Sequence, residues 1–280
     1  MLIYVHRILN LMNEKLSKRF CQSSAEIESP GISWAWWVYF VQIPLVFWYV
    51  KGWIPIHPIV VMLPLVGILN FNVEKRDSNG LGLHCRYPGR SLLVAVVFAG
   101  LSFIGWWVAT RLEGIKIEFP IGPGMMAGTL IQSFLVSILI IAIWEEIVNR
   151  GYLQTRFQAR WGFWGVILTS LLFASMHIPS TLIEHDNDLS WVAFRFAQTS
   201  LIGFALGYVF WRSGSVITTI AVHGLNNFLV TGVLPLFSSI TSQQLSFSQA
   251  PLHLLWLVGQ VGLTVLFCEV FFKDKGNPPT

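Results

Sequence analysis

Two adjacent carboxylates, Glu145 and Glu146, stand at the end of an apolar stretch that carries no charge from residue 127 to residue 144. Arg150 follows four residues after Glu146. Residues four apart share one face of a helix, whereas neighbours point about 100° apart, so Arg150 can hold one carboxylate while the other faces a reaction site. No proline interrupts the following residues as far as the "ARWGFWG" turn, and we expect the helix to continue to that turn. The two glutamates are then predicted to lie inside a lipid bilayer.

Two histidines in later apolar segments are candidates to meet these carboxylates. His177 lies in "VILTSLLFASMHIPS", one helical turn after Phe173, and His223 lies in "SGSVITTIAVHGLNNFLV", one turn before Asn227. The helices of Glu145 and His177 leave the same turn, so we expect these two residues at the same depth. His223 is only about 12 Å along its helix from residue 215, which matches that depth less well. A single intramembrane histidine often serves packing alone, but several ionisable groups that converge predict a functional site.

This combination of side chains suits the hydrolysis of a peptide bond. A carboxylate can deprotonate water, and a histidine or asparagine can hold the oxyanion that develops on the carbonyl. A serine nucleophile is disfavoured because the chain has no GxSxG motif and Ser175 points away from His177 on a helix. Two histidines and a glutamate also form a zinc ligand set, so a divalent metal on Glu145, His177 and His223 stays open, although no HExxH motif occurs. A site without a cofactor is favoured.

The composition predicts an integral membrane protein. Of the 280 residues, 54% are hydrophobic and 11% are charged, which excludes an ordinary soluble domain. The basic residues are spread over loops between apolar segments and do not cluster on one surface, so no nucleic-acid partner is expected. The three cysteines have neither the spacing of a disulfide framework nor that of a thiolate metal site.

We predict an all-α, polytopic bundle of about eight transmembrane helices with both termini in the cytoplasm. The candidate spans are residues 34–50, 54–72, 91–110, 127–146, 162–179, 190–211, 215–234 and 251–272. Most of the 18 basic residues then fall on the side of the termini, as positive-inside orientation requires, while Arg195 falls inside a span. The predicted parts are an amphipathic cytoplasmic segment (1–32), a pair of spans (33–72) and a six-span core (91–272), with the polar residues 73–90 as the hinge.

Three motifs carry a resemblance to a known family. "EEIVNRGYLQTRF" resembles the EExxxR motif of the CAAX protease and bacteriocin-processing (CPBP) family of intramembrane proteases, related to the type II CAAX prenyl endopeptidases. "FASMH" matches its FxxxH motif and "HGLNN" its HxxxN motif, in the family's order and within residues 125–235. Asn149 departs from the pattern, because a bulky apolar residue commonly precedes the motif arginine.

The resemblance implies a role for each motif residue. Glu145 would activate the attacking water, with Glu146 and Arg150 in support. His177 and His223 would complete the site, and Asn227 would help to stabilise the oxyanion. Phe173 and Asn149 are the supporting positions. The family's structural picture resembles a glutamate-activated water without a bound metal, although family members are often described as metalloproteases.

The favoured hypothesis is an intramembrane endopeptidase of the cell (inner) membrane, with an active site that opens to the cytoplasm. Its substrate would be a membrane-bound or secreted peptide or protein. "HGLNN" lacks the cysteine found in eukaryotic prenyl-protein processors, so a prenylated substrate is not implied. The alternative from another class is a non-catalytic membrane partner or bacteriocin-immunity-type protein that keeps the family pocket. A transporter is disfavoured because no repeated half is seen.

Overall fold

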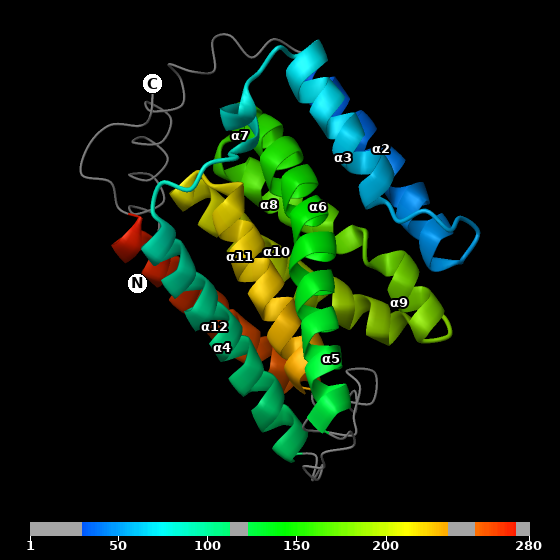
Figure 1. Cartoon of the computed structure of the whole chain (residues 1–280), viewed down its shortest axis with the longest axis vertical. Coiled ribbons are helices and arrows are strands. Elements are labelled where there is room, and N and C mark those ends of the chain that lie inside the picture. Colours follow the sequence, from blue (N-terminus) through cyan, green and yellow to red (C-terminus); the bar gives the residue numbers. More distant parts are fainter. Residues whose placement is uncertain (1–29, 113–122, 235–249, 273–280) are drawn as a thin grey trace.

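The computed structural model describes residues 30–112, 123–234 and 250–272, and every long element in these ranges is a helix (Figure 1). The N-terminal elements are α2 (Pro30–Val50), α3 (Ile59–Gly67), the π-helical η2 (Ile68–Val73) and the short 3₁₀ turn η3 (Ser78–Leu81). A long helix with the two glutamates is described below. The other helices are α4 (Pro88–Leu112), α8 (Phe163–Ser175), α9 (Ile178–Glu184), α10 (Leu189–Ser213), α11 (Val216–Asn227), η6 (Phe228–Val233) and α12 (Ala250–Phe271). The predicted all-α polytopic bundle is confirmed.

Seven helical stretches in the described ranges are long and apolar enough to cross a membrane. They are Gly31–Val50, Pro88–Leu112, Met126–Trp161, Phe163–Glu184, Leu189–Ser213, Val216–Val233 and Ala250–Phe271. The predicted second span, 54–72, corresponds to the shorter apolar helix Ile59–Val73. It begins late because Pro55 and Pro58 cannot donate a backbone N–H, and Pro58 is the residue just before the helix. The predicted amphipathic segment lies almost wholly outside the described residues, and the side on which the termini lie stays a prediction.

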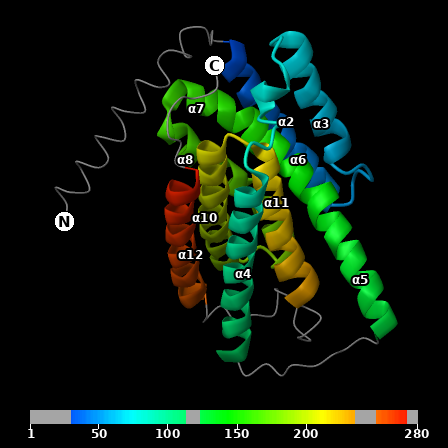
Figure 2. The same ribbon diagram turned by 60° about the vertical axis from the view of Figure 1, so that its left-hand side comes forward.

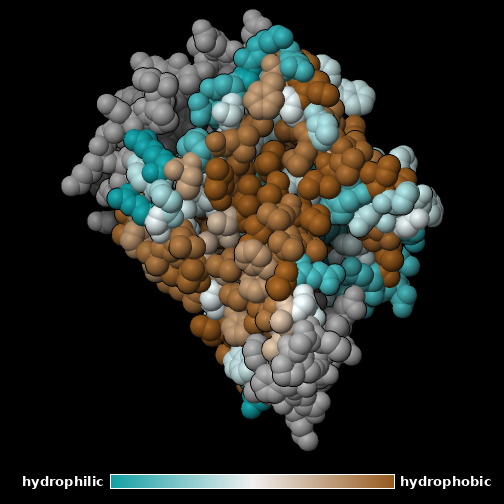
Figure 3. All heavy atoms as spheres, viewed as in Figure 1, coloured by the Kyte–Doolittle hydropathy of each residue, from teal (hydrophilic) through white to brown (hydrophobic). Residues whose placement is uncertain are grey.

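A broad hydrophobic face covers the middle of the molecule, with hydrophilic residues above it and at its lower right (Figure 3). Large apolar side chains are exposed on several helices, among them Trp37 (64% exposed) on α2 and Ile131 (62%) on the long helix. Such a continuous apolar surface would be a liability in water, but it is the natural boundary of a protein that faces lipid. The protein is therefore a multi-pass integral membrane protein.

The helix that contains the two glutamates crosses the whole bundle (Figures 1 and 2). It consists of α5 (Pro123–Leu135), η4 (Val136–Ala142), α6 (Ile143–Glu146), η5 (Ile147–Gln154) and α7 (Thr155–Trp161). Its continuation to the "ARWGFWG" turn is confirmed, since it ends at Gly162, whose φ of +55° suits a glycine. The segments η4 and η5 are π-helical, so the glutamates lie between two stretches of wider helix. Such stretches are rare and occur often at functional sites.

Small residues let the central helices approach closely. A Cβ atom on Gly203 of α10 would lie 3.2 Å from the ring of Phe173 and 3.2 Å from the carbonyl oxygen of Ser170, both on α8. On the glutamate helix, a Cβ atom on Gly151 would lie 2.9 Å from the carbonyl oxygen of Leu81. These contacts position α10 and the segment around η3 directly beside the helices that carry the candidate site.

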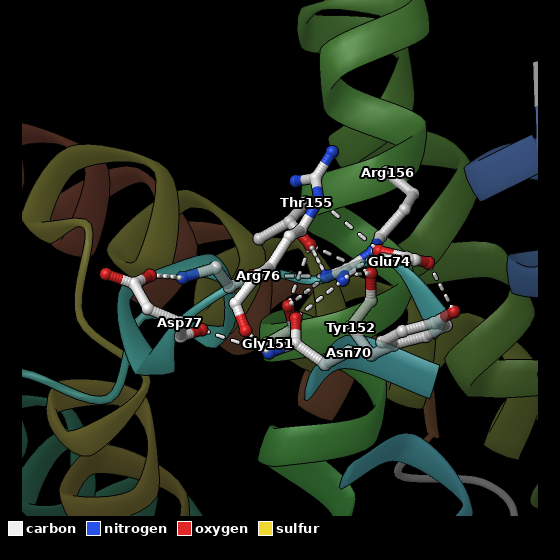
Figure 4. A network of polar contacts seen from close by, with 9 residues as sticks. Asn70, Glu74, Arg76, Asp77, Gly151, Tyr152, Thr155 and Arg156 are labelled. Atoms are coloured by element: carbon white, nitrogen blue, oxygen red, sulfur yellow. Dashed lines mark hydrogen bonds and ion pairs between the residues drawn. The ribbon is translucent and has the colours of Figure 1, made fainter. Parts of the chain in front are cut away.

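A buried polar network joins the predicted hinge to the glutamate helix (Figure 4). The guanidinium of Arg156 on α7 donates to Glu74 Oε2 (2.6 Å), Asn70 Oδ1 (2.8 Å) and the carbonyl oxygen of Gly80 (3.1 Å). The hydroxyl of Tyr152 donates to Glu74 Oε1 at 2.7 Å. Since the Arg156 side chain is wholly buried and that of Glu74 is 8% exposed, each charge depends on the other for compensation.

We expect Arg156→Met to lower the free energy of unfolding by about 3–5 kcal/mol, because it leaves Glu74 as a buried charge without its closest partner. The thermal melt of the purified protein in detergent measures this loss. Adding Glu74→Gln should restore part of the stability. Arg160→Met, at an exposed position one turn away, is the matched control and should leave the melting temperature unchanged. Equal melting temperatures for wild type and Arg156→Met would show that the network does not stabilise the fold.

Candidate active site

Glu146 lies at the centre of a buried cluster. Its Oε1 accepts a hydrogen bond from His223 Nδ1 at 2.8 Å and forms an ion pair with Arg150 NH1 at 3.3 Å. The side chains of Glu146, Arg150 and His223 are 0%, 1% and 6% exposed. The carboxylate thus compensates the buried guanidinium and at the same time fixes the orientation of the imidazole ring.

Glu145 faces the other nitrogen of the same ring. Its Oε2 lies 3.9 Å from His223 Nε2, and its side chain keeps 12% of its surface accessible. Within the described part of the chain, Oε2 has no hydrogen-bond partner. The two neighbouring glutamates therefore contact opposite sides of one histidine. Glu146 does so through Oε1, which also pairs with Arg150, whereas Glu145 approaches Nε2 at a distance that leaves its Oε2 without a hydrogen bond.

Phe173 on α8 packs between the charged and aromatic members of the site. The guanidinium carbon of Arg150 lies 4.3 Å from the centre of its ring, a cation–π contact. The rings of His177 and His223 lie 4.9 Å and 6.1 Å from it, both edge-on. His177 Nδ1 lies 3.0 Å from the carbonyl oxygen of Phe173, one turn earlier. Phe173 itself is 2% exposed, so it fixes these side chains from behind.

The two asparagines differ in their surroundings. Asn149 is fully buried, and its amide nitrogen donates to the carbonyl oxygen of Glu145 at 2.8 Å, within the same helix. It shapes the backbone beneath Glu145. Asn227 ends α11 and is partly exposed, without a hydrogen bond from its side chain to the described residues. Its amide is available to a bound molecule.

The depth of His223 has a cause that the sequence did not reveal. The helix α11 begins at Val216, as the pattern around Ser215 suggests, yet His223 reaches Glu146. Its first turn is held away from the end of the bundle, because the Val216 N–H donates to the carbonyl oxygen of Gly82 at 2.9 Å and the Ser215 hydroxyl donates to that of His84. The helix therefore starts below the segment 82–84 and not at the level of the "ARWGFWG" turn.

His57 also lies near the site, a position that its place in the sequence did not predict. Its ring contacts that of Trp144, the neighbour of Glu145, at 6.0 Å and edge-on. Burial lowers the pKa of His57, and its Nδ1 accepts the Ile59 N–H at 3.2 Å. The ring is therefore neutral near pH 7 and supports the helix by packing.

The side chains considered as zinc ligands do not form a ligand set. In the residues that the structure describes, no three histidine, cysteine, aspartate or glutamate side chains are grouped so that they could hold a metal ion. His223 Nδ1 is already bonded to Glu146, and the nearest contact of His177 Nδ1 is a backbone carbonyl. The geometry thus gives no support to a site made by Glu145, His177 and His223.

Comparison with known proteins agrees with the motifs. The family model described as type II CAAX prenyl endopeptidase Rce1-like matches residues 127–229, which include every member of the cluster described above. No curated protein and no solved structure matches the chain. The predicted resemblance is confirmed over residues 127–229, the part of the chain that holds the candidate active site and is similar to the Rce1-like type II CAAX prenyl endopeptidases.

Proposed function

We propose that the protein is an intramembrane endopeptidase in which Glu145 activates a water molecule for attack on a peptide bond of a membrane-associated peptide or protein. The observation that carries the proposal is the position of Glu145. Its unpartnered Oε2 lies 3.9 Å from His223 Nε2, a separation at which one water molecule can contact both atoms. A carboxylate in that position can take a proton from the water as it attacks, and can later deliver the proton to the leaving amine.

Glu146 and Arg150 have a positioning role in this mechanism. When Nδ1 of His223 donates to Glu146, the neutral ring presents the lone pair of Nε2 to the side of Glu145. That nitrogen can accept the second hydrogen of the water and so orient its oxygen towards the substrate. Arg150 holds the Glu146 carboxylate in place through their ion pair, and its role is to position Glu146 and not to contact the reacting atoms.

The remaining groups act on the substrate carbonyl. The tetrahedral intermediate carries a negative oxygen, which a donor at about 2.7–3.1 Å stabilises. The Asn227 amide is suited to this role because it is partly exposed and free of other side-chain hydrogen bonds in the described chain. His177 lines the same site and can contact the substrate through Nε2, since Nδ1 is bonded to the Phe173 carbonyl. We further propose that the site is entered from the cytoplasm and that the cell membrane is its location.

The proposal is tested by reconstituting the purified protein in liposomes with a library of membrane-inserting peptides and identifying the cut bonds by mass spectrometry. We expect discrete internal cuts. A folded protein that cuts no member of the library would favour the alternative, a non-catalytic membrane partner. The same preparation allows the role of a metal to be measured.

Removal of divalent metals should leave the rate of cleavage unchanged within about a factor of two, because the mechanism uses a carboxylate and not a Lewis acid to generate the nucleophile. Cleavage is followed before and after dialysis against a strong chelator, with a zinc-dependent protease treated in parallel. Loss of activity on chelation and its return with zinc would contradict a metal-free mechanism.

A further inference from the structure

Arg195 is a charged side chain within a membrane span that the mechanism above does not use. It lies in the second turn of α10, within the span Leu189–Ser213, and it is exposed. A guanidinium is costly at this depth, and such residues usually face the interior of a bundle or a wet cavity and have an identifiable partner. Its direction in the bundle therefore indicates what it could bind.

The face of α10 that carries Arg195 is turned to the candidate site. Residues 195, 199 and 203 follow one another at intervals of four and share a face. Gly203 lies against Phe173, and its carbonyl oxygen accepts a hydrogen bond from Arg150 NH2 at 3.2 Å. Arg195 thus lies on the same face, about 12 Å further along the axis of α10, a helix that packs against both α8 and α9.

The electrostatic neighbours of Arg195 agree with this placement. Glu145 and His177 both interact with its charge, as does Glu184 at the end of α9. Its guanidinium donates a hydrogen bond to a neutral group, from NH1 to Gln198 Oε1 at 2.8 Å. In the described part of the chain neither carboxylate forms an ion pair with the guanidinium. One end of the side chain is therefore held while its remaining N–H donors stay available.

The support of Arg195 extends to a second helix. Gln198 is 2% exposed, and its amide nitrogen contacts His253 Nε2 on α12 at 2.9 Å. The ring of His253 lies 4.3 Å from that of Trp106 on α4. A side chain fixed in this way loses less conformational entropy when it binds a ligand.

We propose that Arg195 binds a carboxylate of the peptide substrate, close to the bond that is cut. This inference rests on the proposed function and adds the chemical class of the substrate: an apolar peptide with an anionic group a few residues from the scissile bond. The carboxylate is either the C-terminus or an acidic side chain. A guanidinium presents paired N–H donors that match the geometry of a carboxylate, and such charge-assisted hydrogen bonds are stronger than those between neutral groups.

Binding of uncleavable probes tests the inference without requiring hydrolysis. The probes are apolar hexapeptides with N-methylated bonds and an N-terminal fluorophore, ending in a free carboxylate, in a carboxamide, or in a glutamate carboxamide. They are titrated into liposomes of neutral lipid that contain wild type, Arg195→Gln or Arg195→Lys. Arg160→Gln, an exposed arginine at the far turn of the glutamate helix, is the matched control.

Wild type and Arg160→Gln should bind at least one carboxylate probe roughly tenfold or more tightly than the carboxamide, as for other charge-assisted pairs. Preference for the probe with the free C-terminus would identify the bound group as the C-terminal carboxylate. Preference for the glutamate probe would identify it as an acidic side chain. Arg195→Gln should bind all three probes alike, and Arg195→Lys should keep part of the preference. A preference that persists in Arg195→Gln, or wild type that makes no distinction, would overturn the inference. A failure of the proposed function would instead appear as wild type that binds these probes with the stated preference but cuts no member of the cleavable peptide library.

Discussion

Glu145→Gln is expected to lower kcat for peptide cleavage by roughly 10²–10⁴-fold, the usual contribution of a general base, with little change in the melting temperature. The substitution keeps the shape of the side chain and removes its ability to take a proton. Stability should be retained because Oε2 has no hydrogen-bond partner in the described structure, so the substitution breaks no hydrogen bond at that oxygen. The rate is measured on one peptide that wild type cuts, at saturating concentration in liposomes.

Glu184→Gln is the matched control for this variant. Glu184 is an exposed glutamate on α9 that also interacts with Arg195, so its replacement removes the same charge from the neighbourhood without touching the water-binding position. Its kcat should stay within about a factor of three of wild type. Equal losses in both variants would mean that the overall charge and not the base at Glu145 governs the rate.

Arg150→Met is expected to lose both stability and activity. The variant removes the ion pair with Glu146, the hydrogen bond to the Gly203 carbonyl and the cation–π contact with Phe173. Removal of one member of a buried pair costs about 3–5 kcal/mol, and the freed carboxylate no longer fixes His223 in one orientation. The melting temperature in detergent and the cleavage rate at a temperature where the variant is folded measure the two effects separately.

Two further variants separate the charge of Arg150 from its geometry. Arg150→Lys keeps the charge but cannot contact Glu146, the Gly203 carbonyl and the Phe173 ring at once, so it should recover only part of the rate. The pair Arg150→Met with Glu146→Gln removes the uncompensated charge and should regain stability relative to Arg150→Met alone. An Arg150→Met protein with the wild-type rate and melting temperature would contradict the assigned positioning role.

Local spacing predicted the parts of the site that depend on one helix. The i,i+4 pairing of Glu146 with Arg150 and the continuation of the glutamate helix both follow from sequence periodicity. Phe173 and His177, one turn apart on adjoining segments, are likewise close to each other in the structure. These features need only the geometry of a helix, and they are the ones on which the family motifs also depend.

The features of the site that the sequence could not predict depend on packing between segments that are far apart in the chain. The contact of His223 with Glu146 requires α11 to begin beneath the segment 82–84, and no periodicity records that docking. The π-helical turns on either side of the glutamates are also set by packing against neighbours and have no sequence signature that we could use.

The same limit applies to charges paired across long stretches of chain. Glu74 and Arg156 are 82 residues apart, so their ion pair could not be inferred from spacing. Arg195 was identified as unusual because it falls inside a span, but its face and its neighbours came only from the structure. In a membrane bundle, an isolated charge in the sequence therefore indicates that a partner exists without indicating where the partner lies.

Rescue of Glu145→Ala by formate tests most directly whether this carboxylate is the base. The variant leaves a space that a small carboxylate can enter, and cleavage is measured in liposomes over a range of formate concentrations. The mechanism predicts that Glu145→Ala is inactive without formate and gains activity as formate is added, whereas Glu146→Ala gains none. A Glu145→Ala protein that cuts at the wild-type rate, or formate that accelerates wild type and both variants alike, would contradict it.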